Sequence, residues 1–453
     1  MSTIAAISTP NAAGGIGIIR LSGENAVTIA EKCFRPFSGK PLSGMKGYTA
    51  AYGEVFDREG RIDEAVTLIY RAPKSYTGED VAEICCHGGL YIMQKVLRTV
   101  LSLGAEAAGP GEFTKRAFLN GKMDLAQAES VMSVISAQGS AALNAAQNTL
   151  KGNVSRKIDE IASSLVTAAA GLAAWADYPD EDIPSVENGE LLKTVETAAA
   201  ELKKLIDRYD SGKAVTEGVS TVICGKPNVG KSTLMNILSG FSRSIVTPVA
   251  GTTRDVVEET VRVGDILLRL ADTAGIHDTD DEVESIGVKI AKERMETADL
   301  VLAVFDASRP LGEEDTELLE ACSGRRAVAV INKNDLENKF EVEDIARYIP
   351  EAISVSAKYG DCGDVLKTAL EKVLGTGGLD FSQEMLAGER QLSCAEKAYE
   401  CLKEAAYAIT SGMTADAANV SIDCAVTELY SLTGKNASEE IVSEVFRKFC
   451  VGK

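Results

Sequence analysis

The sequence predicts a multidomain protein with three parts: an N-terminal α+β domain, an all-α domain built from two chain segments, and an α/β domain inserted between those segments. Its 453 residues suit about three domains of ordinary size. Residues 216–378 alternate strand-like and helix-like stretches, which predicts a doubly wound parallel sheet. Helical composition lies on both sides of that stretch. Insertion of a compact domain there is plausible because domain termini often lie close together.

We place the N-terminal domain at residues 1–120, the helical segments at 121–215 and 379–453, and the inserted domain at 216–378. Two independent helical bundles are the alternative, but the second segment has only about 70 residues and would form a thin core. In the first domain, Ile16–Leu21 and Ala65–Tyr70 have the pattern of strands, and Gly89–Leu103 has that of a helix.

The last helix of the chain should hold the C-terminus in place almost to its end. We expect one apolar face on this helix, made by Ile441, Val442, Val445, Phe446 and Phe449. Only Cys450–Lys453 extends beyond it, and four extended residues span about 13 Å. From composition alone, such a tail is best interpreted as a frayed terminus.

Composition and charge exclude several classes of protein. A net charge of −20 argues against a polybasic surface that grips any nucleic acid nonspecifically. Ten cysteines without a C-x-x-C pair indicate a reducing cytoplasm, and two histidines make a Cys/His zinc site improbable. The first residues lack the basic region of a signal peptide. The most apolar helical stretch, Ala162–Ala176, is too short for a membrane span.

The segment Gly225–Thr233 matches the phosphate-loop pattern G-x-x-x-x-G-K-[ST]. The apolar run Val219–Cys224 before it has the pattern of a buried strand, and a helical pattern follows it. Glycines let the backbone N–H groups approach a phosphate chain, while Lys231 supplies positive charge. Ser232 can offer its hydroxyl to Mg²⁺. A chance Gly-rich turn is improbable in this context.

Four further segments, in the expected order, indicate a GTPase. Gly251–Asp255 lies where a switch with a magnesium-binding threonine belongs, and Asp272–Gly275 can hold Mg²⁺ through water and meet a γ-phosphate. Asn332–Asp335 follows a strand, and the Asp335 carboxylate can accept both N–H donors of guanine, which adenine does not offer. Ser356–Lys358 would support the base from its other side. Any one of these segments alone would be unremarkable.

One expected group is missing. Many GTPases place a glutamine directly after D-x-x-G to orient the attacking water. Here that position is Ile276, which cannot donate or accept a hydrogen bond. Another group must orient the water, or hydrolysis must be slow without a partner.

Further distinctive segments lie outside the GTPase motifs: Gly17–Arg20, Tyr76–Glu83 with His87–Gly89, Pro110–Lys122, Asp124–Glu129 and the terminal Cys450–Lys453. With these segments, the full chain resembles the MnmE (also called TrmE) family of bacterial tRNA-modification GTPases and their organellar relatives. The resemblance implies that the N-terminal domain binds folate and forms a homodimer, that two segments form the helical domain, and that the GTPase domain is inserted between them.

The resemblance also implies a function. With the FAD-dependent flavoprotein MnmG, in a heterotetramer, such proteins modify carbon 5 of the wobble uridine in certain tRNAs. An aminomethyl or carboxymethylaminomethyl group is added, and its one-carbon unit comes from 5-formyltetrahydrofolate or methylenetetrahydrofolate. Because the net charge is acidic, we expect the partner to carry most of the tRNA contact.

For the nucleotide, the resemblance implies GTP with Mg²⁺ and K⁺. Mg²⁺ would bind Ser232 and Thr253, and K⁺ would bind Asn228, Thr247, Val249 and Thr252. Glu284 matches the carboxylate that orients water in place of the missing glutamine; without the family it would be interpreted as a solvated acid. The remaining nucleotide-binding positions are Val229, Gly230, Lys231, Thr233, Pro248, Ala250, Gly251, Asp272, Thr273, Ala274, Gly275, Asn332, Lys333, Asn334, Asp335, Ser356, Ala357 and Lys358.

For folate, the matching positions are Arg20, Glu83, Lys122 and Lys453. The resemblance favours a role for Cys450 as a nucleophile or acid near the transferred carbon, which we treat as a hypothesis. Cys85 and Cys86 are expected in the core.

A second function remains open at this point. A GTPase of this type can be a regulatory switch in ribosome or metal-cluster assembly and catalyse no modification. The GTPase segments alone do not separate the two. The folate-type positions and the C-terminal Cys-Val-Gly-Lys favour modification, and folate binding discriminates between them.

Overall fold

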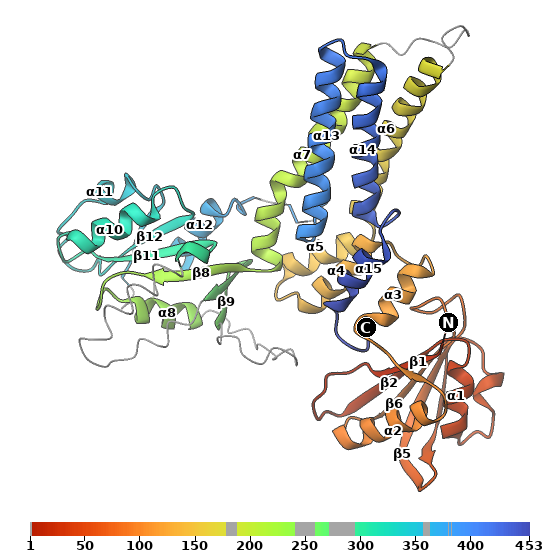
Figure 1. Ribbon diagram of the computed structural model, residues 1–453. Coiled ribbons are helices and arrows are strands. Elements are labelled where there is room, and N and C mark those ends of the chain that lie inside the picture. The colour runs from red at the N-terminus through yellow and green to blue at the C-terminus, as the bar shows by residue number, and fades with distance from the viewer. Residues whose placement is uncertain are drawn as a thin grey trace. The chain divides into compact units, whose positions relative to one another are not determined.

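The computed structural model describes residues 2–177, 188–240, 259–270, 295–356, 363–378, 380–381 and 383–453 (Figure 1). The chain divides into two compact units. One unit contains Met1–Met132, Ile158–Val195 and Glu400–Lys453, and the other contains Ser133–Lys157 and Glu196–Tyr399. The three boundaries that the sequence suggests between the segments stay a prediction.

The first unit contains a seven-stranded sheet in the order β3-β4-β5-β6-β2-β1-β7. Neighbouring strands are antiparallel except β1 and β7, which are parallel. Both strands predicted in this region are confirmed, but the second begins five residues earlier than predicted, at Gly60. The bounds of the strands in this sheet are β1 Ile4–Ile7, β2 Ile16–Ser22, β3 Phe34–Pro36, β4 Thr49–Asp57, β5 Gly60–Tyr70, β6 Val81–His87 and β7 Glu106–Ala107.

Strand alternation gives this sheet two different faces. Side chains such as Ile19 and Ile84 pack in one core with helices α1 (Ala26–Cys33) and α2 (Leu90–Ser102). Arg20 and Glu83, paired in register across β2 and β6, belong to the opposite face. Helix α3 (Glu112–Leu119) packs there through its buried Phe113 against Ile4 and Ala6 of β1. Cys86 is buried as predicted, whereas Cys85 is only half-buried.

Long helices form both predicted helical segments. The first segment contains α4 Leu125–Ser136, α5 Ser140–Leu150, α6 Asn153–Asp177 and α7 Asn188–Thr216, and the second contains α13 Glu389–Thr410, α14 Ala415–Thr433 and α15 Glu439–Arg447. None of the described helices is long and apolar enough to cross a membrane.

The terminal helix α15 corrects one prediction. It ends at Arg447, so Phe449 lies beyond it, and Ile441 is 40% exposed. Val442 and Phe446, one turn apart, are the buried pair, and the Phe446 ring lies 6.4 Å from that of Phe118 in α3. Ile441 stands about 100° around the helix from this stripe and therefore faces away from it.

The second unit holds a six-stranded sheet in the order β13-β12-β11-β8-β10-β9, parallel except for β9 with β10. One face packs on α8 and α12, and the other packs on α10 and α11, which confirms the doubly wound fold. The elements are β8 Val219–Cys224, α8 Lys231–Gly240, β9 Glu259–Val263, β10 Ile266–Leu270, β11 Leu300–Asp306, α10 Glu313–Cys322, β12 Ala327–Asn332, α11 Val342–Ala346, β13 Ala352–Ser354 and α12 Gly363–Val373.

Candidate functional site

The phosphate loop connects β8 to the first turn of α8, as its sequence predicts. The Lys231 ammonium folds over the loop and donates to the carbonyls of Gly225 (2.6 Å) and Lys226 (2.8 Å). Burial lowers the pKa of Lys231 below its usual range. Both acceptors are neutral, so they leave the positive charge available for a phosphate. Ser232 and Thr233 are exposed at the helix start, where a phosphate-bound metal ion would meet them.

Residues from the end of β12 fasten this loop. The buried Asn332 amide donates to the carbonyl of Val229 at 2.8 Å. Lys333 donates to the carbonyl of Asn228 at 2.9 Å and forms an ion pair with Asp306 at 2.6 Å. The motif that the sequence assigned to base recognition therefore also holds the phosphate loop in shape.

The side chain of Asn332 lies so close to the phosphate loop that position 230 requires a glycine. Gly230 has a φ of +104°, and a Cβ built on it would lie 2.1 Å from the Asn332 Nδ2 atom. A side chain there would collide with the amide that anchors Val229. Asn228 also has a positive φ, +62°, which asparagine tolerates better than most residues.

Asp335 and Ser356, both predicted to contact the base, lie side by side. The Ser356 hydroxyl donates to the Asp335 carboxylate at 2.6 Å, and the backbone N–H of Asn334 donates to the carbonyl of Val355. Asp335 is exposed and ionised oxygens accept hydrogen bonds only, so it can accept both guanine donors.

Several predicted positions lie outside the described residues. They are the switch residues Thr247, Pro248, Val249, Ala250, Gly251, Thr252 and Thr253, the turn Asp272, Thr273, Ala274 and Gly275, the acid Glu284, and Ala357 and Lys358. Their roles stay predictions.

A second polar cluster lies on the N-terminal sheet. The Arg20 guanidinium forms an ion pair with Glu83 at 2.7 Å, and the two side chains are only 16% and 13% exposed. Its carbon atom lies 5.7 Å from the centre of the Tyr76 ring and 5.6 Å from that of Phe113. The Tyr76 hydroxyl shares a 2.8 Å hydrogen bond with Thr114. Arg20 therefore has an acidic partner and two aromatic neighbours.

The C-terminal tail lies against this cluster. Val451 forms an antiparallel bridge with Pro110, and the carbonyl of Cys450 accepts from the N–H of Gly111 at 3.2 Å. The carbonyl of Gly452 accepts from the Ser8 hydroxyl at 3.1 Å and from Arg20 at 3.4 Å. Figure 1 marks the C-terminus close to α3 in this unit. The tail, which composition alone would make a frayed end, has a defined place.

The comparisons with known proteins cover the whole chain. The family model described as "GTP-binding protein TrmE N-terminus" matches residues 3–122, and the "MnmE helical domain" model matches residues 125–450. The protein named tRNA modification GTPase MnmE from Clostridioides difficile (strain 630) is 42% identical over 100% of this chain and 99% of its own length. That of Thermoanaerobacter pseudethanolicus is 40% identical with the same coverage.

The chain belongs to the MnmE family of tRNA modification GTPases. GTP hydrolysis is the activity of this family, and this chain carries the phosphate-loop pattern between β8 and α8. A solved structure of Era with MgGDPNP and a 16S ribosomal RNA segment is 30% identical, covering 40% of this chain and 66% of that one. Its TM-score is 0.27.

Three of the four predicted folate positions come together, and one does not. Lys453 is half-buried beside Arg20 and Glu83; burial first, and then the Arg20 charge, lower its pKa. Lys122 instead donates to the carbonyl of Pro73 at 3.1 Å. This hydrogen bond joins Lys122 to the loop between β5 and β6 and not to Arg20.

Sequence reasoning missed the residues that surround Arg20. Tyr76 and Phe113 lie within the two motifs that carry the family resemblance, and that placement is the signal that could have identified them. The sequence around Ser8 gives no such signal, because Ser8 hydrogen-bonds to Gly452 only where the C-terminal tail lies against the sheet.

Proposed function

We propose that this GTPase serves the modification of carbon 5 of the wobble uridine in certain tRNAs. It would act with an FAD-dependent partner of the MnmG type, and the one-carbon unit would come from 5-formyltetrahydrofolate or methylenetetrahydrofolate. The added group is aminomethyl or carboxymethylaminomethyl. The observation that carries this proposal is the convergence of Arg20, Glu83 and the Cys450–Lys453 tail at one place in the N-terminal unit.

The chemistry of this convergence suits a folate. A folate carries glutamate carboxylates, and Arg20 and Lys453 supply two cations for them. Next to those carboxylates it carries a flat aminobenzoyl ring, and Tyr76 and Phe113 offer aromatic surfaces beside the cations. Glu83 is an acceptor for N–H groups of the ligand. The folate supplies the one-carbon unit, while the protein's part is to bind and orient it.

Cys450 lies in the same tail, and its side chain is exposed. Its backbone is tied to Gly111, which keeps the thiol near Lys453. The transferred carbon would lie beside these groups if Lys453 binds the folate. We propose that Cys450 acts on the transferred carbon or donates a proton there.

For hydrolysis, we propose that Ser232 and Thr253 ligate Mg²⁺ and that Asn228, Thr247, Val249 and Thr252 ligate K⁺. Glu284 would orient the attacking water, because Ile276 cannot. Pairing of two GTPase domains would complete the site. Two observations on the described residues support this proposal. Ser232 is exposed, so its hydroxyl is accessible to Mg²⁺. Lys333 holds the backbone carbonyl of Asn228, which fixes the position of a K⁺ ligand.

A homodimer through the N-terminal sheet is supported by an apolar surface. Tyr52 and Val66 are paired in register and are 55% and 38% exposed. The Phe37 ring lies 5.1 Å from that of Tyr52 and is also 55% exposed. Such uncovered aromatic surface is typical of a protein interface. With a net charge of −20, tRNA would be bound mainly by the partner, in the cytoplasm.

The deciding experiment is deletion of the gene followed by mass analysis of wobble uridines. We expect the modified nucleoside to disappear and to return with the wild-type gene. A purified protein should also bind 5-formyltetrahydrofolate, and Arg20→Ala should abolish that binding. Unchanged uridines and no folate binding would favour the regulatory switch, in which GTP turnover governs assembly and no base is modified.

A further inference from the structure

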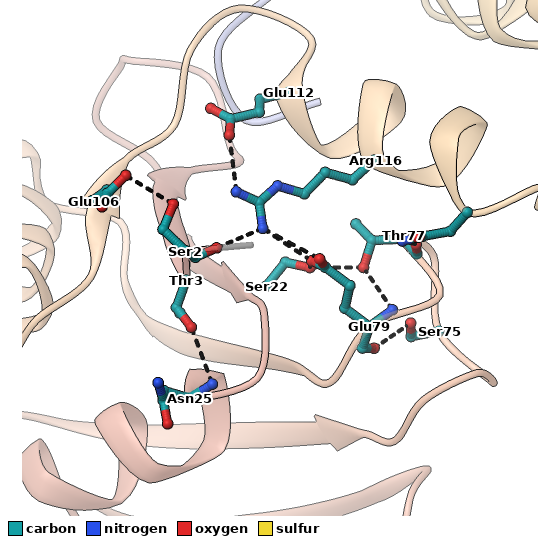
Figure 2. A network of polar contacts seen from close by, with 11 residues as sticks. Ser2, Thr3, Ser22, Asn25, Ser75, Thr77, Glu79, Glu106, Glu112 and Arg116 are labelled. Carbon is teal, nitrogen blue, oxygen red and sulfur yellow. Dashed lines mark hydrogen bonds and ion pairs between the residues drawn. The ribbon is translucent and has the colours of Figure 1, made fainter.

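A largely buried ion pair joins two of the elements that carry Arg20, Glu83, Tyr76 and Phe113, which together are called the Arg20 cluster. Glu79, in the loop between β5 and β6, contacts Arg116 of α3 at 3.2 Å, with side chains only 15% and 6% exposed (Figure 2). Arg116 also forms an ion pair with Glu112 at 3.0 Å and donates to the carbonyl of Ser2 at 2.7 Å. The Arg116 guanidinium therefore contacts three separate groups while its side chain is almost fully buried.

Glu79 extends this contact to strand β2. The Ser22 hydroxyl donates to the Glu79 carboxylate at 2.7 Å and shares a 2.7 Å hydrogen bond with Thr77. The Ser75 hydroxyl donates to the backbone carbonyl of Glu79 at 2.5 Å. Figure 2 shows these groups converging between the strand, the loop and the helix. The loop is therefore fastened at several points around one carboxylate.

Each of the three elements carries one member of the Arg20 cluster. Strand β2 carries Arg20 two residues before Ser22, the loop carries Tyr76 three residues before Glu79, and α3 carries Phe113 three residues before Arg116. The spacing of the rings around Arg20 therefore depends on how these elements are joined.

We propose that Glu79 and Arg116 are positioning residues that clamp the loop and α3 to β2, so that Tyr76 and Phe113 flank the Arg20 guanidinium. This inference rests on the proposed folate site. The clamp would hold the residues of that site in place before a folate binds. Glu79 belongs to the Tyr76–Glu83 motif and Arg116 to the Pro110–Lys122 motif. The clamp explains why these two residues occur there, because the proposed function gives them no other role.

The physical reason is preorganisation. A buried carboxylate that loses its cation is strongly unfavourable, so Glu79 would turn to solvent and take the loop with it. Tyr76 would then leave Arg20, and a ligand would have to order the loop as it binds. Affinity falls when binding includes such an ordering step.

The test follows the Tyr76 position directly, without any ligand. Trp175 is the only tryptophan of the chain. In a Trp175→Phe, Tyr76→Trp protein, the indole reports this position through acrylamide quenching. Arg116→Met should raise quenching several-fold, and Arg116→Lys, which keeps the charge, should restore part of the protection. A matched control is Arg61→Met, because Arg61 pairs with Glu54 in the same sheet but is 53% exposed. This control should change nothing.

The same substitutions in the otherwise wild-type protein test the consequence for binding. Arg116→Met should raise the dissociation constant for 5-formyltetrahydrofolate at least tenfold and leave GTP turnover unchanged. If Arg116→Met does not fold, Glu79→Gln with Arg116→Met, which leaves no unpaired charge, takes its place. A lower melting temperature with unchanged quenching and unchanged affinity would show a merely structural role and overturn the proposal.

Arg20→Ala separates the two levels of inference. If Arg20→Ala binds folate as well as wild type, the folate site is wrong, while quenching still decides whether the clamp exists. If Arg20→Ala abolishes binding but Arg116→Met does not weaken it, the folate site stands and the clamp is overturned.

Discussion

Arg20 and Gly452 are 432 positions apart in the chain, yet the guanidinium of one donates to the carbonyl of the other at 3.4 Å. The contact depends on a backbone that suits glycine. Gly452 has a φ of +98°, and a Cβ there would lie 2.4 Å from the carbonyl oxygen of Ile7. The tail can therefore reach Arg20 only while this position lacks a side chain.

Gly452→Ala should displace the tail. The left-handed backbone alone costs an alanine about 1–2 kcal/mol, and the collision with Ile7 adds to it. We expect wobble-uridine modification to fall about as far as in a protein lacking the last four residues, with GTP turnover near normal in both. Nucleoside mass analysis and a phosphate-release assay measure the two effects. Full modification by Gly452→Ala would show that the seated tail is not required.

Lys453 should couple folate binding to proton uptake at alkaline pH. Burial and the Arg20 charge lower the pKa of Lys453 below the ordinary 10.5. The protonated side chain therefore makes the bound position of the tail less stable. This destabilisation disappears as the pH rises from the lowered pKa toward 10.5. A bound carboxylate would raise the pKa again. Between the lowered pKa and 10.5, binding should therefore take up protons, and affinity should fall as pH rises.

Calorimetry in two buffers with different ionisation heats measures this uptake. Lys453→Met should remove it and flatten the dependence on pH. Equal heats in both buffers for the wild-type protein would contradict the placement of a folate carboxylate beside Lys453.

Asp335→Asn should change the base that the protein selects. The carboxylate accepts two guanine N–H groups, and charge-assisted hydrogen bonds are worth about 1.5–3 kcal/mol each. GTP binding should weaken by roughly a hundredfold, and xanthosine triphosphate should bind better, because its carbonyl can accept from the new amide. Competition against a fluorescent nucleotide measures both. Unchanged GTP affinity would make the assignment of Asn332–Asp335 wrong.

The nucleotide site could be predicted because its information is local. The spacing of Gly225–Thr233 and of Asn332–Asp335 determines which backbone groups and side chains lie at the ends of β8 and β12, and the structure confirms both strands. The link from Lys333 to Asn228 could not be predicted, since it depends on how two loops approach across the sheet edge.

The place of the tail could not be predicted from local pattern. Nothing in Cys450–Lys453 indicates that it pairs with Pro110 and Gly111, because such pairing is set by where α15 packs. The same packing decided which part of the apolar face of α15 is buried. Ile441 fits the sequence pattern, but α3 contacts the stripe of Val442 and Phe446. Helical periodicity predicts which side of a helix is apolar, but it does not predict which residues at the border of that side are buried.

Gly230→Ala should loosen the phosphate loop. Its Cβ would meet the Asn332 amide at 2.1 Å, so Asn332 must give up its contact with Val229. Overpacking of this kind typically costs about 1–3 kcal/mol. We expect a lower melting temperature and weaker GTP binding together. A substitution that left both unchanged would show that the Asn332 anchor is dispensable.

The last prediction concerns potassium. If Asn228 is a K⁺ ligand, GTP hydrolysis should be much faster in potassium than in sodium, because a cation beside the phosphates can replace an arginine finger, which is worth roughly 10³–10⁵ in turnover. Asn228→Gly tests the side chain alone. Its φ of +62° suits glycine, and the contact that holds it comes from Lys333 to the backbone carbonyl, which glycine keeps.

Asn228→Gly should therefore bind GTP nearly as wild type but lose the difference between potassium and sodium. Glu284→Ala, in contrast, should lower turnover in both salts, since it removes the group that orients water. Steady-state phosphate release at saturating GTP separates the two variants. Equal wild-type turnover in sodium and potassium would leave Asn228 without this role. A potassium effect that survives in Asn228→Gly would assign it to other residues.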